Sequence, residues 1–205
     1  MSVAPIIRAG FIEEALPNSG EWIFVDPGFA KDKSRSCGLL TGSGECELVT
    51  FADLRARLVA LATSNEGPMN LVIEAPLSVA FSALGNPGGR SFELRDGKTR
   101  YWYVGLGCSV LTSATYLLRA ITDAKRNREI RLFEGFVSFK PKGIASDHCK
   151  DVLDLRGVVW GEEVVGCIAS AKPLDPLHSI FSSFAVAGMN YGVPPIVVVG
   201  KSEVP

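Results

Sequence analysis

The sequence lacks several features that would assign it to a familiar class of protein. No apolar run approaches the roughly 20 residues needed to cross a bilayer, so we expect no membrane span. The five cysteines are widely spaced and form no CxxC pair, which argues against both a zinc site and a disulfide framework. We therefore expect five reduced and mostly buried thiols.

The net charge is close to zero, and the sequence contains few histidines. The formal net charge is −1, so any binding of nucleic acid must depend on local basic clusters. His148 and His178 are the only histidines, and no Ser or Cys motif beside them indicates a hydrolase triad. The N-terminal segment has two acids soon after a short apolar patch, which fits neither a signal peptide nor a transit peptide. We expect a cytoplasmic protein without membrane contacts.

The most informative stretch present is Trp22 to Phe29, WIFVDPGF. Four apolar residues run without a break into Asp26, a pattern typical of a strand that is covered on both faces. Pro27 favours extended geometry for Asp26 and cannot donate to a sheet, so the carboxylate should lie at the carboxyl end of a central strand. Ligands bind at this edge of open α/β sheets.

A second segment, NLVIEAP at residues 70–76, repeats the pattern, because Glu74 follows three apolar residues and precedes a proline by two positions. If the two strands are parallel neighbours, Asp26 and Glu74 lie side by side within reach of one cation. A single acid at a strand end is more often a turn residue or a helix cap. The pairing of two such acids is what favours a metal site.

A third group of acids lies in SDHCKDVLDL, which predicts a helix capped by Ser146. Asp147, Asp151 and Asp154 are spaced i, i+4 and i+7, so they share one helical face. Like charges at this spacing destabilise a helix unless a cation lies opposite them. The helix dipole alone explains Asp147 more readily than Asp151, and either acid could face a cation from this helix.

Two groups of basic residues could hold a phosphate backbone. Arg90 and Arg100 lie in a long segment without convincing periodicity, next to a YWY run, and such loops are often functional. The alternative is that the aromatic run packs on the sheet while the arginines are only solvated. Lys140 and Lys142 follow the strand expected at 130–139.

The remaining pattern predicts one domain at residues 21–205, with an N-terminal extension at 1–20 and a C-terminal extension from about residue 161. The first strand and two further strands should form an antiparallel meander. Beyond the segments already described, we expect strands at 36–41, 47–51 and 194–200 and helices at 51–64, 108–127 and 177–189.

This order of elements, with acids on the first and fourth strands and on a later helix, resembles the ribonuclease H-like superfamily. It is most similar to the Holliday-junction-resolvase type and to a related family of predicted ribonuclease H-like nucleases. The resemblance covers roughly residues 20–160 and is carried by VDPG, VIEAPLS and DHCKDVLDL. It implies an α/β fold with a ribonuclease H-like mixed five-stranded sheet, an antiparallel meander plus parallel strands, and flanking helices.

The resemblance also implies a function. The expected activity is hydrolysis of phosphodiester bonds in DNA or RNA by a mechanism that uses two Mg²⁺ or Mn²⁺ ions. These hard cations prefer oxygen ligands, so a cluster of carboxylates without His or Cys suits them. The alternative is an inactive ribonuclease H-like scaffold in a larger nucleic-acid or phage-related assembly, and a homodimer is left open. The expected catalytic and metal-binding residues are Asp26, Glu74, Asp147 and Asp151, and the expected substrate-binding residues are Arg90, Arg100, Lys140 and Lys142.

Overall fold

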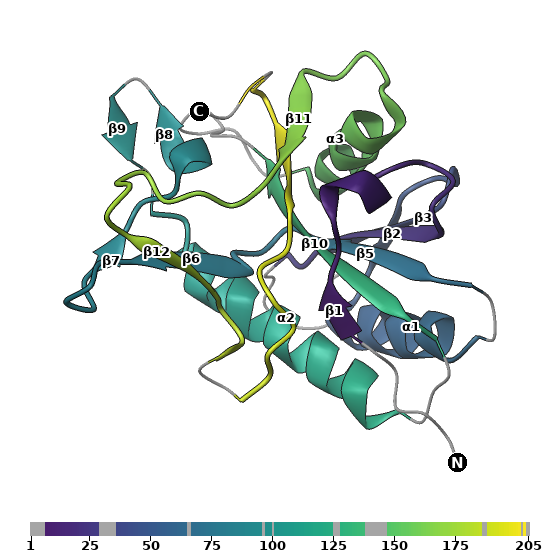
Figure 1. The fold of residues 1–205 in the computed structure, drawn as a ribbon. Coiled ribbons are helices and arrows are strands. Elements are labelled where there is room, and N and C mark those ends of the chain that lie inside the picture. Colours follow the sequence, from purple (N-terminus) through teal and green to yellow (C-terminus); the bar gives the residue numbers. More distant parts are fainter. Residues whose placement is uncertain are drawn as a thin grey trace.

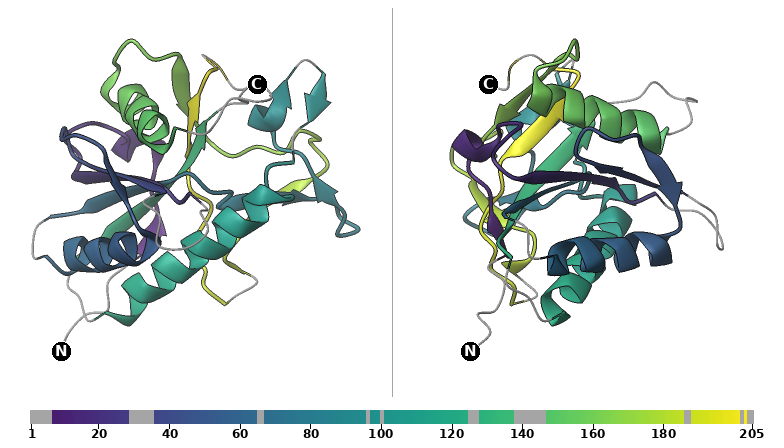
Figure 2. Two further views of the ribbon diagram at one scale, coloured as in Figure 1. Left: turned by 180° about the vertical axis from the view of Figure 1, so that it is seen from behind. Right: turned by 90° about the vertical axis from the view of Figure 1, so that its right-hand side faces the viewer.

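A mixed β-sheet forms the centre of the molecule, as the computed structural model shows in Figure 1. Helix α3 (His148–Trp160) covers one face, and helices α1 (Phe51–Thr63) and α2 (Leu106–Asp123) cover the other (Figure 2). The predicted α/β class with a mixed sheet is confirmed. The residues described by the structure are 7–28, 36–64, 67–95, 97–99, 101–124, 128–137, 147–185, 188–201 and 203.

Within these residues the main sheet has eight strands in the order β11-β13-β10-β5-β2-β3-β4, with β1 paired to β10 outside this path. The strands β2, β3 and β4 form the predicted antiparallel meander, while β2, β5, β10 and β13 run parallel. The sheet is larger than the five strands expected, because β1, β13 and β11 extend it beyond β10. The bounds are β1 Ile7–Ala9, β2 Glu21–Asp26, β3 Cys37–Thr41, β4 Glu47–Val49, β5 Met69–Ile73, β10 Ile130–Val137, β11 Gly166–Ala169 and β13 Ile196–Val199.

Burial on both faces of the sheet explains the continuous apolar runs. Successive side chains of a strand point to opposite faces, so Trp22 and Phe24 pack in the cluster beneath α3 while Ile23 and Val25 pack in the cluster that faces α1 and α2. All four residues are at most 1% exposed. The first strand therefore occupies the central, doubly covered position that its sequence predicted.

Short strands form a smaller unit beside the main sheet. The strand β12 pairs with β6, and none of the described residues in 177–189 is α-helical, so the helix predicted there is wrong. Pairing with β6 and the contact between the Phe81 and Phe181 rings, 6.2 Å between centroids, favour the extended conformation there. The short elements are β6 Ser78–Phe81, β7 Pro87–Gly88, β8 Leu94–Arg95, β9 Lys98–Thr99 and β12 Ser179–Ser182, with 3-10 helices η1 Ile12–Glu14 and η2 Ser91–Glu93.

Two described segments refine the sequence expectations. Residues 7–20, which the sequence left without a role, add β1 to the main sheet and place Ala15 in the core beneath α3. Helix α1 begins after Thr50, which caps it, because Thr50 Oγ1 accepts a hydrogen bond from the Asp53 N–H at 3.1 Å. None of the helices in the described ranges combines the length and the apolar character needed to cross a bilayer.

Candidate metal centre

Three potential ligand side chains meet at the carboxyl end of β2. Asp26 is the last residue of β2, where the sequence placed it, and its side chain is 8% exposed. Helix α3 crosses this end of the strand and brings His148 and Asp151 to it. Each of the three residues offers one ligand atom, and these atoms lie within 4.8 Å of one another. Among the residues that the structure describes, these three side chains form the one group of acidic, His or Cys residues that lie close enough together to hold a single cation.

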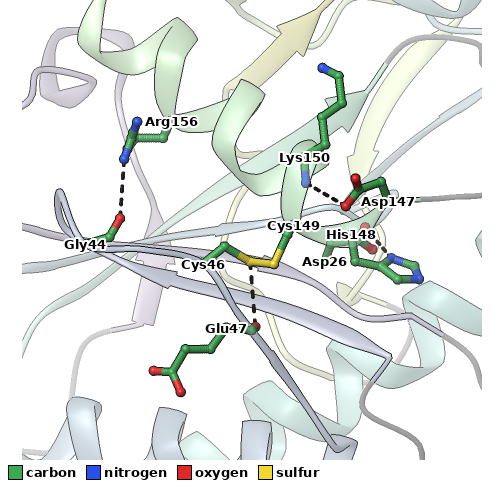
Figure 3. The surroundings of a disulfide bond; sticks show 9 residues. All are labelled: Asp26, Gly44, Cys46, Glu47, Asp147, His148, Cys149, Lys150 and Arg156. Atoms are coloured by element: carbon green, nitrogen blue, oxygen red, sulfur yellow. Dashed lines mark hydrogen bonds and ion pairs between the residues drawn. A yellow bond between two sulfur atoms is a disulfide. The ribbon is translucent and has the colours of Figure 1, made fainter.

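His148 and Asp26 are in direct contact (Figure 3). The distance between His148 Nδ1 and Asp26 Oδ2 is 2.6 Å, and the imidazole is 22% exposed. A hydrogen bond of this kind fixes the orientation of both side chains. The interaction makes His148 part of the site, although the sequence analysis gave it no role.

Two glycines make room for His148. A Cβ atom at Gly28 would lie 2.5 Å from His148 Nε2, and a Cβ atom at Gly38 would lie 2.5 Å from the His148 carbonyl oxygen. Gly38 is also the residue that pairs with Asp26 across β2 and β3. The absence of side chains at these positions lets the first turn of α3 lie directly beside Asp26.

Asp151 supplies the second carboxylate. It is 2% exposed and lies in the first turn of α3, where its N–H donates to the Asp147 carbonyl at 2.9 Å. Two buried carboxylates so close to each other raise the free energy of the site unless positive charge compensates them. A divalent cation held by the cluster would supply positive charge at this point.

Asp147 has a different role from Asp151. It is exposed and caps α3, because its side chain accepts a hydrogen bond from the Lys150 N–H at 3.1 Å. Ser146, the predicted cap, lies outside the described residues. Asp154, the last acid of the series, pairs with the Lys150 ammonium group. The geometry therefore favours Asp151 over Asp147 as a metal ligand.

Glu74 lies at the same sheet edge as Asp26. The strands β2 and β5 are parallel neighbours with Val25 opposite Ile73, as the metal hypothesis required. Glu74 follows β5 directly, and its N–H donates to the Val25 carbonyl at 2.8 Å. Glu74 is half-buried and borders the cluster without being one of its three members.

Arg90 is not available for substrate binding, which corrects the sequence expectation. The residue is 0% exposed, and its guanidinium donates to Glu134 Oε1 at 2.6 Å and to Glu93 Oε1 at 2.9 Å. Burial raises the pKa of the Glu134 carboxyl to about 7, with Arg90 and Ser78 opposing that effect. Arg90 thus compensates buried acids in the interior instead of facing solvent.

The other expected phosphate contacts, Arg100, Lys140 and Lys142, lie outside the described residues. The alternative that the neighbouring YWY run packs on the sheet is confirmed at Trp102. Its ring packs against Phe136 of β10, with 5.1 Å between the ring centroids. Tyr101 is 47% exposed.

A disulfide links Cys46 to Cys149, which corrects the expectation of five reduced thiols. The two cysteines are 103 residues apart in the sequence, but their Cα atoms are only 5.5 Å apart because α3 lies over the meander. Sequence spacing alone gives no sign of this proximity. Of the remaining thiols, Cys37 is buried and has a pKa raised by that burial, while Cys108 is exposed.

No protein-family model matches the chain, and searches among curated proteins and among solved structures likewise return no match. The case for a function therefore depends on the site itself. One signal in the sequence could have identified His148: a His followed three residues later by an Asp places both side chains on one helical face.

Proposed function

We propose that the protein is a divalent-metal-dependent nuclease that hydrolyses phosphodiester bonds of nucleic acid. The observation that carries this proposal is the meeting of Asp26, His148 and Asp151 at the end of a central strand, beside Glu74. The antiparallel meander, the parallel strands that follow it and the acidic helix over the same edge support the resemblance to ribonuclease H-like proteins.

The donor set fits a hard or borderline divalent cation. Asp26, His148 and Asp151 would hold the ion, and Glu74 lies at the same sheet edge. Two carboxylates and one imidazole suit Mn²⁺ at least as well as Mg²⁺, because imidazole favours the transition metals. A bound divalent ion supplies Lewis-acid chemistry, since it lowers the pKa of a coordinated water and stabilises charge on a phosphate.

The protein's own residues prepare the site in two ways. The contact between His148 Nδ1 and Asp26 Oδ2 holds the Asp26 carboxylate in one orientation. The low exposure of Asp26 and Asp151 excludes water from their charges, which strengthens their attraction for a cation. Gly28 and Gly38 maintain this geometry by letting α3 approach the sheet.

The decisive experiment compares Asp26→Asn with Asp147→Asn. The first substitution removes a buried charge from the cluster, and the second removes an exposed charge from the helix cap, where Asn caps as well as Asp. We expect Asp26→Asn to abolish Mn²⁺-dependent cleavage of labelled DNA, RNA and branched substrates and to weaken Mn²⁺ binding in calorimetry. Asp147→Asn should retain both.

The same experiment separates the nuclease from the scaffold alternative. Cleavage that persists in Asp26→Asn would refute the proposed catalytic site. If wild-type protein shows no saturable binding of Mn²⁺ near millimolar concentration, a ribonuclease H-like binding or scaffold protein becomes the better description. Circular dichroism of each variant shows whether a lost activity reflects lost folding.

A further inference from the structure

The disulfide is attached to the turn that builds the cluster. Cys46 lies between β3 and β4, and Cys149 lies in the first turn of α3 (Figure 3). Cys149 directly follows His148 and precedes Asp151 by two residues. One covalent bond therefore connects the meander to the helical turn that carries two of the three cluster residues.

The rest of α3 is held by packing that does not depend on this bond. Val152, Leu155 and Val159 are buried in the core beneath the helix. Two turns beyond Cys149, Arg156 also donates to the Gly44 carbonyl at 3.4 Å. Loss of the bond should therefore free the first turn of α3 while the body of the helix stays on the sheet.

The first turn is less buried than the rest of the helix, although Asp151 in it is 2% exposed. Asp147 and Lys150 are exposed, and His148 and Cys149 are only half-buried. The polar contact between His148 and Asp26 and the disulfide both connect the exposed side of this turn to the sheet. Small displacements of a turn that carries ligands are costly to a metal site, because affinity depends on pre-organised ligand positions.

We propose that thiol–disulfide exchange at Cys46–Cys149 regulates cation binding by Asp26, His148 and Asp151, an inference that rests on the proposed metal site. Both cysteines are half-buried, so a dithiol reductant can reach the bond. A thiolate of the reductant attacks one sulfur and forms a mixed disulfide, and its second thiol then displaces the protein sulfur. Two electrons and two protons pass to the protein, which gains two thiols, while the reductant becomes a disulfide.

The test is an Mn²⁺ titration of the full chain in two redox states. One sample is oxidised, and the other is reduced with a phosphine that is removed before calorimetry under anaerobic conditions; thiol counting verifies each state. We expect the reduced form to bind Mn²⁺ about tenfold more weakly or worse, the scale typical of lost support around a metal site. The double variant Cys46→Ser/Cys149→Ser should bind as the reduced form does and should not respond to reductant.

Control measurements make each outcome decisive. Cys108→Ser removes an exposed free thiol and should leave the redox response unchanged. Equal Mn²⁺ affinity in both redox states would overturn the regulatory inference and leave the proposed metal site standing. Absence of binding in the oxidised form would overturn both proposals. Unfolding on reduction, seen by circular dichroism, would show that the bond serves stability instead of regulation.

Discussion

The buried carboxyl group of Glu134 should contribute stability that is present in mild acid and is lost toward neutral pH. Glu134 lies on β10 and is 0% exposed, and it shares the Arg90 guanidinium with Glu93. When all three groups are ionised, the buried network carries one net negative charge in apolar surroundings. Burial accordingly raises the pKa of Glu134 from 4.5 to about 7.

The magnitude and the sign follow from this difference. A carboxyl group with a higher pKa in the folded state binds its proton more tightly there, so its contribution to stability is complete below about pH 4.5 and is lost as the pH rises through about 7. At about 1.36 kcal/mol for each pKa unit, the full loss is about 3 kcal/mol.

Urea unfolding followed by tryptophan fluorescence, to which the buried Trp22 contributes, provides the assay. The free energy of unfolding is measured at pH 5, 6, 7 and 8 for the wild type and for Glu134→Gln, because the difference between the two cancels the other titrating groups. We expect Glu134→Gln to become more stable than the wild type toward pH 8, by up to about 3 kcal/mol. Parallel pH profiles for the two proteins would refute the reasoning.

Three further expectations concern the site and its support. Gly38→Ala should displace the first turn of α3 and reduce Mn²⁺ affinity, because the new Cβ would lie 2.5 Å from the His148 carbonyl oxygen. Gly67→Ala is the matched control: a Cβ at Gly67 would meet no atom within 4 Å, so this variant should bind Mn²⁺ normally in the same titration. Leu155→Ala should lower the free energy of unfolding by about 2–5 kcal/mol in urea, since Leu155 is fully buried beneath α3. His148→Ala should weaken Mn²⁺ binding by at least about tenfold, and more than it weakens Mg²⁺ binding, when both are measured by calorimetry; an unchanged ratio of the two affinities would exclude His148 as a ligand.

The central strands could be predicted from the sequence because their signal is local. An apolar run that stops at Asp26, followed by Pro27, reports both burial on two faces and the end of the strand. The same signal at Glu74 predicted the neighbouring parallel strand, and Val25 does lie opposite Ile73. Local pattern therefore placed two of the expected site residues at one sheet edge.

The errors occur where the structure depends on contacts between distant segments. Arg90 in a glycine-rich stretch resembles a solvated surface residue, and only the folded chain brings Glu134, 44 residues away, to its guanidinium. The strand at Ser179–Ser182 likewise depends on pairing with β6, about a hundred residues earlier. In both cases the partner is remote, so no window of the sequence contains the information.

The composition of the cluster shows the same dependence at the site itself. The sequence argument favoured carboxylates alone, because each strand-end acid was visible locally and hard divalent cations prefer oxygen ligands. His148 reaches Asp26 because Gly28 and Gly38 leave space on the sheet and because α3 docks over β2 and β3. The position of α3 on the sheet therefore determines which ligand atoms the proposed metal site would offer. Because His148 adds a nitrogen to the carboxylate oxygens, the expected preference moves from Mg²⁺ toward transition metals such as Mn²⁺. The disulfide joins the meander to the same turn of α3 that carries His148. Under the proposed redox regulation, reduction of Cys46–Cys149 should therefore change the preference of the site between Mn²⁺ and Mg²⁺ as well as its affinity.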